Sequence, residues 1–372
     1  MLAGSLVYCV MVVIAVRRYR SVRPPAFASA FPISILKPLA GLDLGLEENL
    51  RSFFTQDYSA PFEILFAVRT AADPAVAVVE KLRAEFPGVP SRLILTGEPP
   101  YANAKVFSLD QMQREARFDL LVMSDSDIRV DHSMLRVIAS EFSDPKVSLA
   151  TCPYRAVGGP SLWSRLEAAG MDTEFWGGAL VARMLEGMKF AVGPTIVARR
   201  ALLQQIGGFD VLKDYLAEDF VMGHRAAELG AGVILSAYVI EHRIGSHGWR
   251  INFAHRLRWA RSTRRSRPAG YVGQLFTNPL PVALVLLAMQ PGWWPLVFAT
   301  LLVRAAAARA VATGALGAKV AWLLLPVQDV LSFVFWVAGF FGNSIRWRGR
   351  VYRLLRDGRF ELVEGVPKGT PS

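Results

Sequence analysis

Two aspartates separated by one serine, Asp125 and Asp127, follow a short apolar run and carry the chemistry of a cation site. The run, residues 120–123, has the length and composition of a buried strand. Side chains at the carboxyl end of such a strand face the crevice where open α/β sheets bind ligands. Carboxylate oxygens suit a hard divalent cation, Mg²⁺ or Mn²⁺, that also contacts phosphates. The pair therefore predicts a metal-diphosphate site, whereas the simpler alternative is a cap on the following turn.

A second acidic pair, Glu218 and Asp219, opens a segment with helical spacing at residues 218–229. Taken alone, the pair is typical of a negative first turn that interacts with the helix dipole. An enzyme that activates an alcohol also needs a carboxylate beside the reacting hydroxyl group. Asp219 is therefore the candidate catalytic base.

Three further side chains are candidates for binding the donor or the acceptor. Arg258 can hold a diphosphate through two parallel hydrogen bonds, and its neighbour Trp259 can form a wall of the acceptor site. The same two residues also fit a snorkelling arginine beside an interfacial tryptophan. Lys105 is a candidate phosphate contact, although a solvated helix face explains it nearly as well.

The segments that must position these residues alternate between strand and helix patterns. This alternation predicts an α/β fold with a mostly parallel sheet covered by helices on both faces. The expected strands are residues 33–36, 63–68, 92–95, 119–123, 147–152 and 196–198, and the expected helices are 46–55, 74–86, 105–116, 162–188 and 218–229.

Apolar segments at both ends of the chain predict an integral membrane protein. Residues 2–16 precede a basic cluster at 17–20, which the positive-inside rule places in the cytoplasm. Residues 278–303 and 320–341 are expected to form an even number of C-terminal spans, most simply two. Asp329 lies in the second of them and is expected to contact the bundle interior. The predicted domains are an anchor at 1–20, a cytoplasmic catalytic domain at 21–273, a transmembrane region at 274–345 and a basic cytoplasmic tail at 346–372.

The chain carries a formal net charge of +11, and its basic residues are unevenly placed. Eight arginines and no acid occur from 243 to 267, immediately before the C-terminal apolar region. This position favours a juxtamembrane collar that faces anionic lipid over a nucleic-acid surface. We therefore expect a lipid bilayer and no nucleic acid among the partners.

Taken together, these residues resemble the ceramide glucosyltransferases and their bacterial relatives, including the hopanoid-biosynthesis glycosyltransferases. The resemblance covers nearly the whole chain and implies a GT-A fold, a UDP-sugar donor, a divalent cation and inverting transfer of a hexose to a lipid hydroxyl group. It places the catalytic domain on the cytoplasmic face of a bacterial inner membrane. In chain order, the matching segments are Ser34-Ile35-Leu36-Lys37-Pro38-Leu39 with Gly41 and Asp43, then Asp73-Pro74-Ala75, Asp125-Ser126-Asp127, Ala217-Glu218-Asp219-Phe220, Arg258-Trp259, and Trp347-Arg348 with Tyr352-Arg353.

The family's roles carry over to individual positions of this chain. The metal-proximal aspartate falls on Asp125, with Asp127 completing the pair, and the catalytic base falls on Asp219. The arginine and tryptophan of the family's Gln/Arg-x-x-Arg-Trp element fall on Arg258 and Trp259. The resemblance thus implies the same assignments that the residue types suggest.

This chain departs from the family pattern at two positions. His255 stands where the Arg-Trp element has glutamine or arginine. Thr70 stands near the place where the eukaryotic enzymes carry an early nucleotide-binding aspartate, and Asp73, three residues on, is the candidate substitute.

Two other classes of function share some of these features. A processive polysaccharide synthase has the same acidic motifs and Arg-Trp element, but the few C-terminal spans leave little room for a polymer channel. A catalytically silent membrane scaffold would be expected to lack one of the acidic motifs, and all are present. The sequence leaves open whether the sugar is glucose, N-acetylglucosamine or another hexose, and whether the lipid is ceramide, a hopanoid or diacylglycerol.

Overall fold

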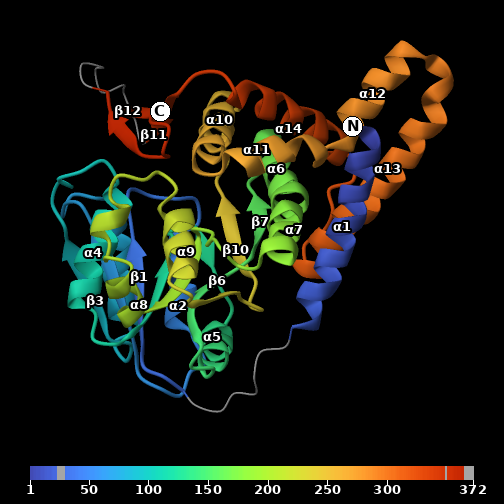
Figure 1. Ribbon diagram of the computed structural model, residues 1–372. Helices are drawn as coiled ribbons and strands as arrows, with labels where there is room; N and C mark the ends of the chain where they lie inside the picture. The colour runs from blue at the N-terminus through green and yellow to red at the C-terminus, as the bar shows by residue number, and fades with distance from the viewer. Residues whose placement is uncertain (23–29, 348–349, 364–372) are drawn as a thin grey trace. The chain divides into compact units, whose positions relative to one another are not determined.

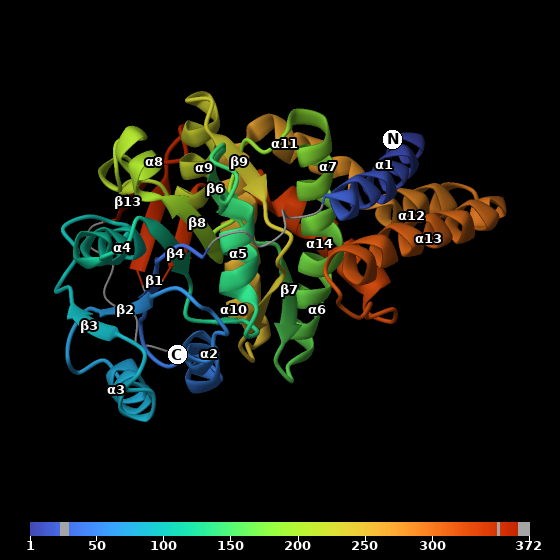
Figure 2. The same ribbon diagram turned by 90° about the horizontal axis from the view of Figure 1, so that it is seen from below.

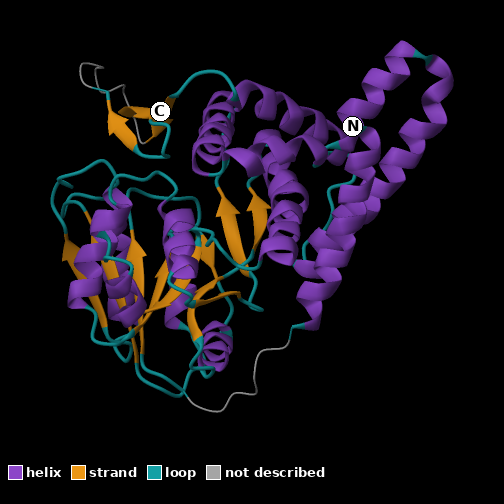
Figure 3. Cartoon of the chain, viewed as in Figure 1, coloured by secondary structure: helices purple, strands orange, loops and turns teal. Residues whose placement is uncertain are grey.

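The computed structural model describes residues 1–22, 30–347 and 350–363, and the chain within it divides into two compact units. We call them the sheet unit, residues 23–154 and 188–243, and the helical unit, residues 1–22, 155–187 and 244–372. Figure 3 shows the strands gathered mainly in the first and the long helices in the second. Segments 155–187 and 244–273, predicted to belong to the catalytic domain, are part of the helical unit. Residues 348–349 and 364–372 of the predicted tail lie outside the described residues.

A seven-stranded sheet forms the centre of the sheet unit (Figure 1), with the strand order β3-β2-β1-β4-β8-β6-β9. Its neighbouring strands are parallel, except that β8 runs antiparallel to both β4 and β6. The predicted mixed, mostly parallel sheet is therefore confirmed. The strands are β1 (Ile33–Pro38), β2 (Phe62–Val68), β3 (Ser91–Leu95), β4 (Leu120–Ser124), β6 (Val147–Thr151), β8 (Thr195–Arg199) and β9 (Gly232–Leu235).

Helices cover both faces of this sheet, as Figure 2 shows for α4 and α9 on one face and α2 and α3 on the other. The central strands are apolar at nearly every position because both of their faces are buried. The helices of the sheet unit are α2 (Leu46–Phe54), α3 (Ala75–Glu85), α4 (Ala104–Glu115), α5 (Met134–Phe142), α8 (Arg200–Gln205), the short η2 (Asp210–Leu212) and α9 (Glu218–Glu228).

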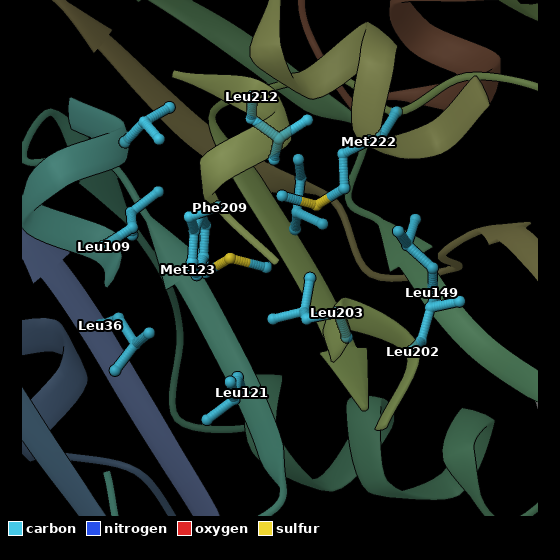
Figure 4. Close-up of a cluster of buried hydrophobic side chains, with 14 of the residues drawn as sticks. Leu36, Leu109, Leu121, Met123, Leu149, Leu202, Leu203, Phe209, Leu212 and Met222 are labelled. Atoms are coloured by element: carbon cyan, nitrogen blue, oxygen red, sulfur yellow. The ribbon is translucent and has the colours of Figure 1, made fainter. Parts of the chain in front are cut away.

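The core of the sheet unit lies on the face that α4, α8 and α9 cover (Figure 4). Leu36 of β1 and Leu121 and Met123 of β4 point to this face, where they join Leu109 of α4 and Met222 of α9. Alternate residues of a strand point to opposite faces. The helices α4 and α9, which carry site residues, therefore pack on the strands β1 and β4 near the end of which the site lies.

A short antiparallel pair forms next to the end of β4. Strand β5 (Ile128–Arg129) pairs with β10 (Ile240–Ile244), so that His242 lies opposite Ile128. Neither strand was expected, and the two residues of β5 are too few to show periodicity in the sequence. The chain passes from one unit to the other within β7 (Tyr154–Gly158) and at the end of β10.

The helical unit contains two stretches that are long and apolar enough to cross a membrane, among the residues that the structure describes. They are α1 and the continuous stretch Pro291–Ala315, and the bent pair Pro268–Phe276 and Pro279–Met289 makes a third if it counts as one span. The elements of the unit are α1 (Leu2–Ser21), α6 (Leu162–Gly170), η1 (Met171–Phe175), α7 (Trp176–Glu186), α10 (Trp249–Ser266), α11 (Pro268–Gly273), η3 (Gln274–Phe276), α12 (Pro279–Met289), η4 (Pro291–Trp293), α13 (Trp294–Arg309), η5 (Ala310–Ala315), α14 (Leu325–Gly339), β11 (Ser344–Trp347), β12 (Arg350–Leu354) and β13 (Phe360–Leu362).

The predicted N-terminal apolar helix is confirmed, but the C-terminal helices begin and end at other residues than expected. The segment expected at 278–303 is divided between α12 and α13, with the three-residue η4 between them. The segment expected at 320–341 contains α14, which has 15 residues and is short for a span of about 20. The second long apolar stretch lies instead at Pro291–Ala315.

Several arginines of the predicted lipid collar make contacts inside the helical unit. Arg261 Nε donates to the carbonyl oxygen of Phe341 at 3.0 Å, and Arg264 Nη2 donates to that of Gly342 at 2.9 Å. Both guanidinium groups thus interact with the chain just after α14, where helix carbonyls lack partners. Arg267 pairs with Glu186 at 2.7 Å. A lipid-facing role for the remaining arginines stays a prediction.

At Gly223 the helix α9 lies very close to the backbone of residues 190 and 191. A Cβ atom at this position would lie 2.2 Å from the backbone nitrogen of Ala191. We expect Gly223→Ala to lower the free energy of unfolding by at least roughly 1–3 kcal/mol, because helix and backbone must separate. Gly88→Ala is the matched control, since a Cβ there meets nothing within 4 Å. Thermal unfolding of the purified protein measures both, and equal midpoints would contradict this packing.

Candidate active site

Asp125 and Asp127 lie just beyond β4, between β1 and β8 in the sheet. The backbone nitrogen of Asp125 donates to the carbonyl oxygen of Pro194 at 3.0 Å, which fixes the turn against the start of β8. The two carboxylates are half-buried, with side chains that are 30% and 32% exposed. The strand end predicted from the sequence thus presents both acids at the edge of the sheet.

Lys105 connects the two acidic pairs. Its Nζ lies 2.7 Å from Asp125 Oδ1 and 3.3 Å from Glu218 Oε1, and it donates to the carbonyl oxygen of Gly193 at 3.3 Å. Burial alone would lower the pKa of Lys105, but the surrounding carboxylates outweigh burial and raise it. The ammonium group therefore remains charged and holds together acids that are far apart in the sequence.

The start of α4 places Lys105 at this point. Asn103 caps the helix by accepting a hydrogen bond from the backbone nitrogen of Val106 at 3.2 Å. Its amide nitrogen donates to the carbonyl oxygen of Tyr215 at 2.8 Å and to Glu218 Oε2 at 3.4 Å. One buried side chain thus fixes both the first turn of α4 and the segment that leads into α9.

Asp219 begins α9 beside Glu218. Its Oδ1 accepts a hydrogen bond from the backbone nitrogen of Phe220 at 2.8 Å. Its Oδ2 approaches the backbone of Gly193 so closely that a Cβ there would lie 2.9 Å away. Burial, and then the negative charge of Glu218, raise the pKa of Asp219 to about 6. A carboxylate with this pKa can accept a proton near neutral pH.

The environment of Asp127 has the opposite effect. His242 Nε2 lies 3.1 Å from Asp127 Oδ2, because the pairing of β10 with β5 brings the histidine beside the turn. Burial would raise the pKa of Asp127, but the neighbouring His242 outweighs it, and the pKa is lowered. By contrast, burial raises the pKa of Asp125 despite the opposing charge of Lys105.

Lys37 of β1 is a second buried ammonium group beneath the acidic turn. Its Nζ lies 3.3 Å from Ser124 Oγ, contacts the carbonyl oxygen of Asp125 and lies 3.9 Å from the ring centroid of Phe53. Burial lowers its pKa to about 7. Sequence reasoning gave Lys37 and His242 no role in the site. Lys37 stands near the end of a mostly apolar strand, which by itself does not indicate its partners.

The residues present fit an oxygen-binding cation shared with phosphates better than a cage made by the protein alone. Asp127 Oδ1 is buried and has no hydrogen-bond partner within the described ranges. No group of three or more His, Cys, Asp or Glu side chains that could hold a metal occurs among these residues. Mg²⁺ in particular is commonly held by one or two carboxylates, with substrate phosphates and water as the remaining ligands.

Asp73 has a different environment from the acidic cluster. Both of its carboxylate oxygens accept from the backbone nitrogen of Gly41 at 3.1 Å, and Oδ1 also accepts from that of Ala75 at 2.9 Å. These bonds join the loop after β1 to the start of α3. Contact of Asp73 with a nucleotide stays a prediction.

Arg258 and Trp259 belong to α10 in the helical unit. The guanidinium group of Arg258 lies 5.8 Å from the ring centroid of Trp347, and the ring of Trp259 lies 4.2 Å from that of His255. His255 Nδ1 in turn lies 2.8 Å from Glu167 Oε1. Glu167 was not expected from the sequence. Contacts of Arg258 with a diphosphate and of Trp259 with an acceptor stay predictions.

Comparison with known proteins relates this site to sugar transfer. Residues 1–360 match the family model described as glycosyl transferase family 21. Ceramide glucosyltransferase 1 of Caenorhabditis elegans is 30% identical over 209 residues, which are 55% of this chain and 44% of the relative. Ceramide glucosyltransferase 3 of the same organism is 29% identical over 216 residues, with shares of 55% and 45%. The match thus spans less than half the length of these curated relatives.

A solved structure supports the fold. The mannosyltransferase PcManGT from Pyrobaculum calidifontis, in complex with GDP-Man and Mn²⁺, superposes with a TM-score of 0.54 and 19% sequence identity, over 91% of this chain and 95% of that one. The predicted GT-A fold is thereby confirmed.

The raised pKa of Asp219 predicts a pH-dependent effect of Asp219→Asn on stability. A folded-state pKa of about 6 against 3.8 makes the charged carboxylate destabilising above pH 6, and this cost disappears below pH 4. We therefore expect the variant to exceed the parent in free energy of unfolding by on the order of 2–3 kcal/mol at pH 7 to 8. Denaturant unfolding from pH 4 to pH 8, with Asp214→Asn as the control, measures how the difference grows between pH 4 and pH 6 and then levels off. A difference independent of pH would contradict this origin.

Proposed function

Because the chain belongs to glycosyltransferase family 21, we propose that it transfers a hexose from a UDP-sugar to the hydroxyl group of a membrane lipid, with inversion at the anomeric carbon. Glucose and N-acetylglucosamine are the proposed sugars, and ceramide or a hopanoid the proposed acceptor. The names of the curated relatives support ceramide and glucose. These specific assignments are proposals, since the chain matches less than half the length of those relatives.

The observation that carries the proposal is the cluster in which Lys105 joins Asp125 to Glu218 and so to Asp219. It combines two carboxylates suited to a cation with a separate carboxylate whose pKa of about 6 suits a base. A transfer from a nucleotide diphosphate to an alcohol requires both functions, charge neutralisation at the leaving group and removal of a proton from the nucleophile.

Asp125 and Asp127 are the proposed ligands of a divalent cation, Mg²⁺ or Mn²⁺. When bound, such a cation offsets the negative charge that develops on the departing diphosphate. Lys37 contacts the backbone carbonyl oxygen of Asp125, and His242 contacts the carboxylate of Asp127, and these contacts hold the two aspartates in place. Lys105 is the proposed phosphate contact, since its ammonium group already lies among the acids at the edge of the sheet.

Asp219 is the proposed general base. It accepts the proton of the lipid hydroxyl group while the lipid oxygen forms a bond to the anomeric carbon of the sugar. The bond between that carbon and the diphosphate oxygen breaks, and UDP leaves with the electron pair. Attack from the face opposite UDP inverts the configuration. Glu218 assists because its negative charge keeps Asp219 more basic than an ordinary aspartate.

Three further residues keep the roles expected from the sequence. Arg258 is proposed to neutralise the departing diphosphate, Trp259 to line the acceptor site, and Asp73 to contact the nucleotide. The apolar helices α1 and Pro291–Ala315 support an integral membrane protein. We place the sheet unit on the cytoplasmic face of a bacterial inner membrane, with anionic lipid near the basic helix α10.

Asp219→Asn is the direct test of the base. The variant is expected to lose on the order of 10²–10⁴-fold in kcat while it binds UDP normally, since the amide cannot accept the proton. In the parent protein, log kcat/KM should fall by about one per pH unit below pH 6, where Asp219 becomes protonated. Transfer of labelled sugar into extracted lipid measures both. Full turnover by the variant would remove Asp219 from this role.

Asp125→Ala and Asp127→Ala test the cation site. Both variants should weaken UDP binding in the presence of Mn²⁺ and show little further loss on addition of a chelator. The parent should lose UDP affinity when the cation is removed, because no divalent cation then offsets the repulsion between the diphosphate and the two carboxylates. Calorimetry with and without chelator gives the comparison, and Asp119→Asn is a control on the exposed start of the same strand. Donor binding that ignores chelators would contradict the metal assignment.

One incubation separates the proposed function from the two alternatives considered from the sequence. Membranes that contain the protein are supplied with labelled UDP-glucose or UDP-N-acetylglucosamine, and lipid and polymer fractions are collected. Labelled lipid supports the proposal, labelled polymer indicates a processive synthase, and no label in either fraction fits a silent scaffold.

A further inference from the structure

The helical unit contains a half-buried carboxylate, Glu174, and the described residues that donate hydrogen bonds to it are neutral. Its Oε1 accepts from Thr277 Oγ1 at 3.1 Å and from Asn278 Nδ2 at 2.9 Å. Thr277 and Asn278 are 7% and 2% exposed. An ionisable group within a membrane-associated bundle is costly unless it serves a purpose, so it points to a functional site.

Two buried polar atoms around Glu174 lack a partner within the described part of the chain. Asn278 Oδ1 is one, although the amide nitrogen of the same side chain binds Glu174. Tyr8 Oη of α1 is the other. It lies 3.6 Å from the position of a Cβ at Gly178, which follows Glu174 by four residues on a continuous helical stretch and so shares its face. Buried polar atoms without partners indicate a missing ligand or water.

The backbone around this group is irregular on both sides. Glu174 lies in the π-helical turn η1, and such turns occur frequently at functional sites. Thr277 and Asn278 form the break between η3 and α12, where the flanking helices bend by 50°. At membrane depth, non-helical backbone is tolerated where it is buried in protein or lines a polar cavity.

A second charged pair in the same unit lacks these features. Arg304 donates to both carboxylate oxygens of Asp329, at 2.8 Å to Oδ1 and 2.9 Å to Oδ2, and also reaches Thr173 Oγ1 at 3.2 Å. The two side chains are 4% and 1% exposed. The positive charge of Arg304 is already balanced by Asp329, and we therefore regard this pair as structural.

From this arrangement we propose that Glu174, Asn278 and Tyr8 form a binding site for the polar head of an uncharged lipid that donates hydrogen bonds through hydroxyl or amide N–H groups. A carboxylate and an amide oxygen accept hydrogen bonds, and the tyrosine hydroxyl group can donate one back. The carboxylate repels a head group with a net negative charge, so the site disfavours anionic phospholipids such as phosphatidylglycerol. Phe175, 44% exposed beside Glu174, offers an apolar surface for the lipid chain.

The site rests on the proposed function in that its ligand class is the acceptor for sugar transfer. It deepens that proposal by naming the chemistry of lipid selection within the helical unit. A test that measures lipid binding without a sugar donor keeps the two apart. Binding can be present while transfer fails, and transfer can occur when this site plays no part.

The experiment measures the affinity of the full-length protein in detergent for a short-chain ceramide and for phosphatidylglycerol of matched acyl length, by native mass spectrometry. We expect the parent protein to prefer ceramide, and Glu174→Gln to weaken ceramide binding about tenfold, as for the loss of hydrogen bonds to a charged group. Tyr8→Phe, which removes only a hydroxyl group, should weaken it by a few-fold.

Glu186→Gln on α7 is the matched control, because Glu186 pairs with Arg267 away from this group, and it should bind ceramide as the parent does. UDP binding should be unchanged in every variant. Equal ceramide affinity in Glu174→Gln, Tyr8→Phe and the parent, or equal parent affinity for the two lipids, would overturn the proposal. If Glu174→Gln fails to fold, Tyr8→Phe alone decides the outcome.

Discussion

The ammonium group of Lys105 is the contact on which the candidate site depends. Without it, Asp125, Glu218 and Asp219 would gather negative charge at a half-buried sheet edge with Lys37 as the remaining nearby ammonium. Carboxylates that lie close together raise one another's pKa, and their mutual repulsion destabilises the folded state. Because Asn103 ties the first turn of α4 to the segment before α9, the position of this lysine is set by the same packing that sets the acids.

Asp219 and Asp127 have the same side chain, but their surroundings give the two carboxyl groups different pKa values and suit them to different roles. Burial and the charge of Glu218 keep Asp219 basic, whereas the adjacent imidazole of His242 favours the charged form of Asp127. Environments that push the pKa values of two carboxyl groups apart distinguish a proton acceptor from a permanent anion. The antiparallel pairing of β5 with β10 produces this difference, since it delivers His242 to the turn.

The parts of this arrangement that were predictable are those with a local signal. An apolar run before Asp125 and alternating periodicity around it predict the parallel strands and the edge where the acids lie. Lys37 and His242 have no such signal, because their partners are 88 and 115 residues away and the pairing that joins β5 and β10 covers two residues on one side. The C-terminal helices were misplaced for a related reason. Proline at 291 and 295 suggested interruption, yet it stands in the first turns of helices, where it is tolerated.

Two acidic side chains of the helical unit, Asp329 and Glu174, have different kinds of partner, and this difference bears on function. Arg304 and Asp329 close on each other and leave nothing for a third molecule, as a bundle requires for stability. Within the described part of the chain, the hydrogen-bond donors to Glu174 are the neutral side chains of Thr277 and Asn278, beside a π-helical turn and a 50° bend that interrupt regular backbone hydrogen bonds. A purely structural carboxylate would gain more from an arginine than from an amide and a hydroxyl group. The weaker partners make sense if the carboxylate must remain available to a ligand that enters from the lipid.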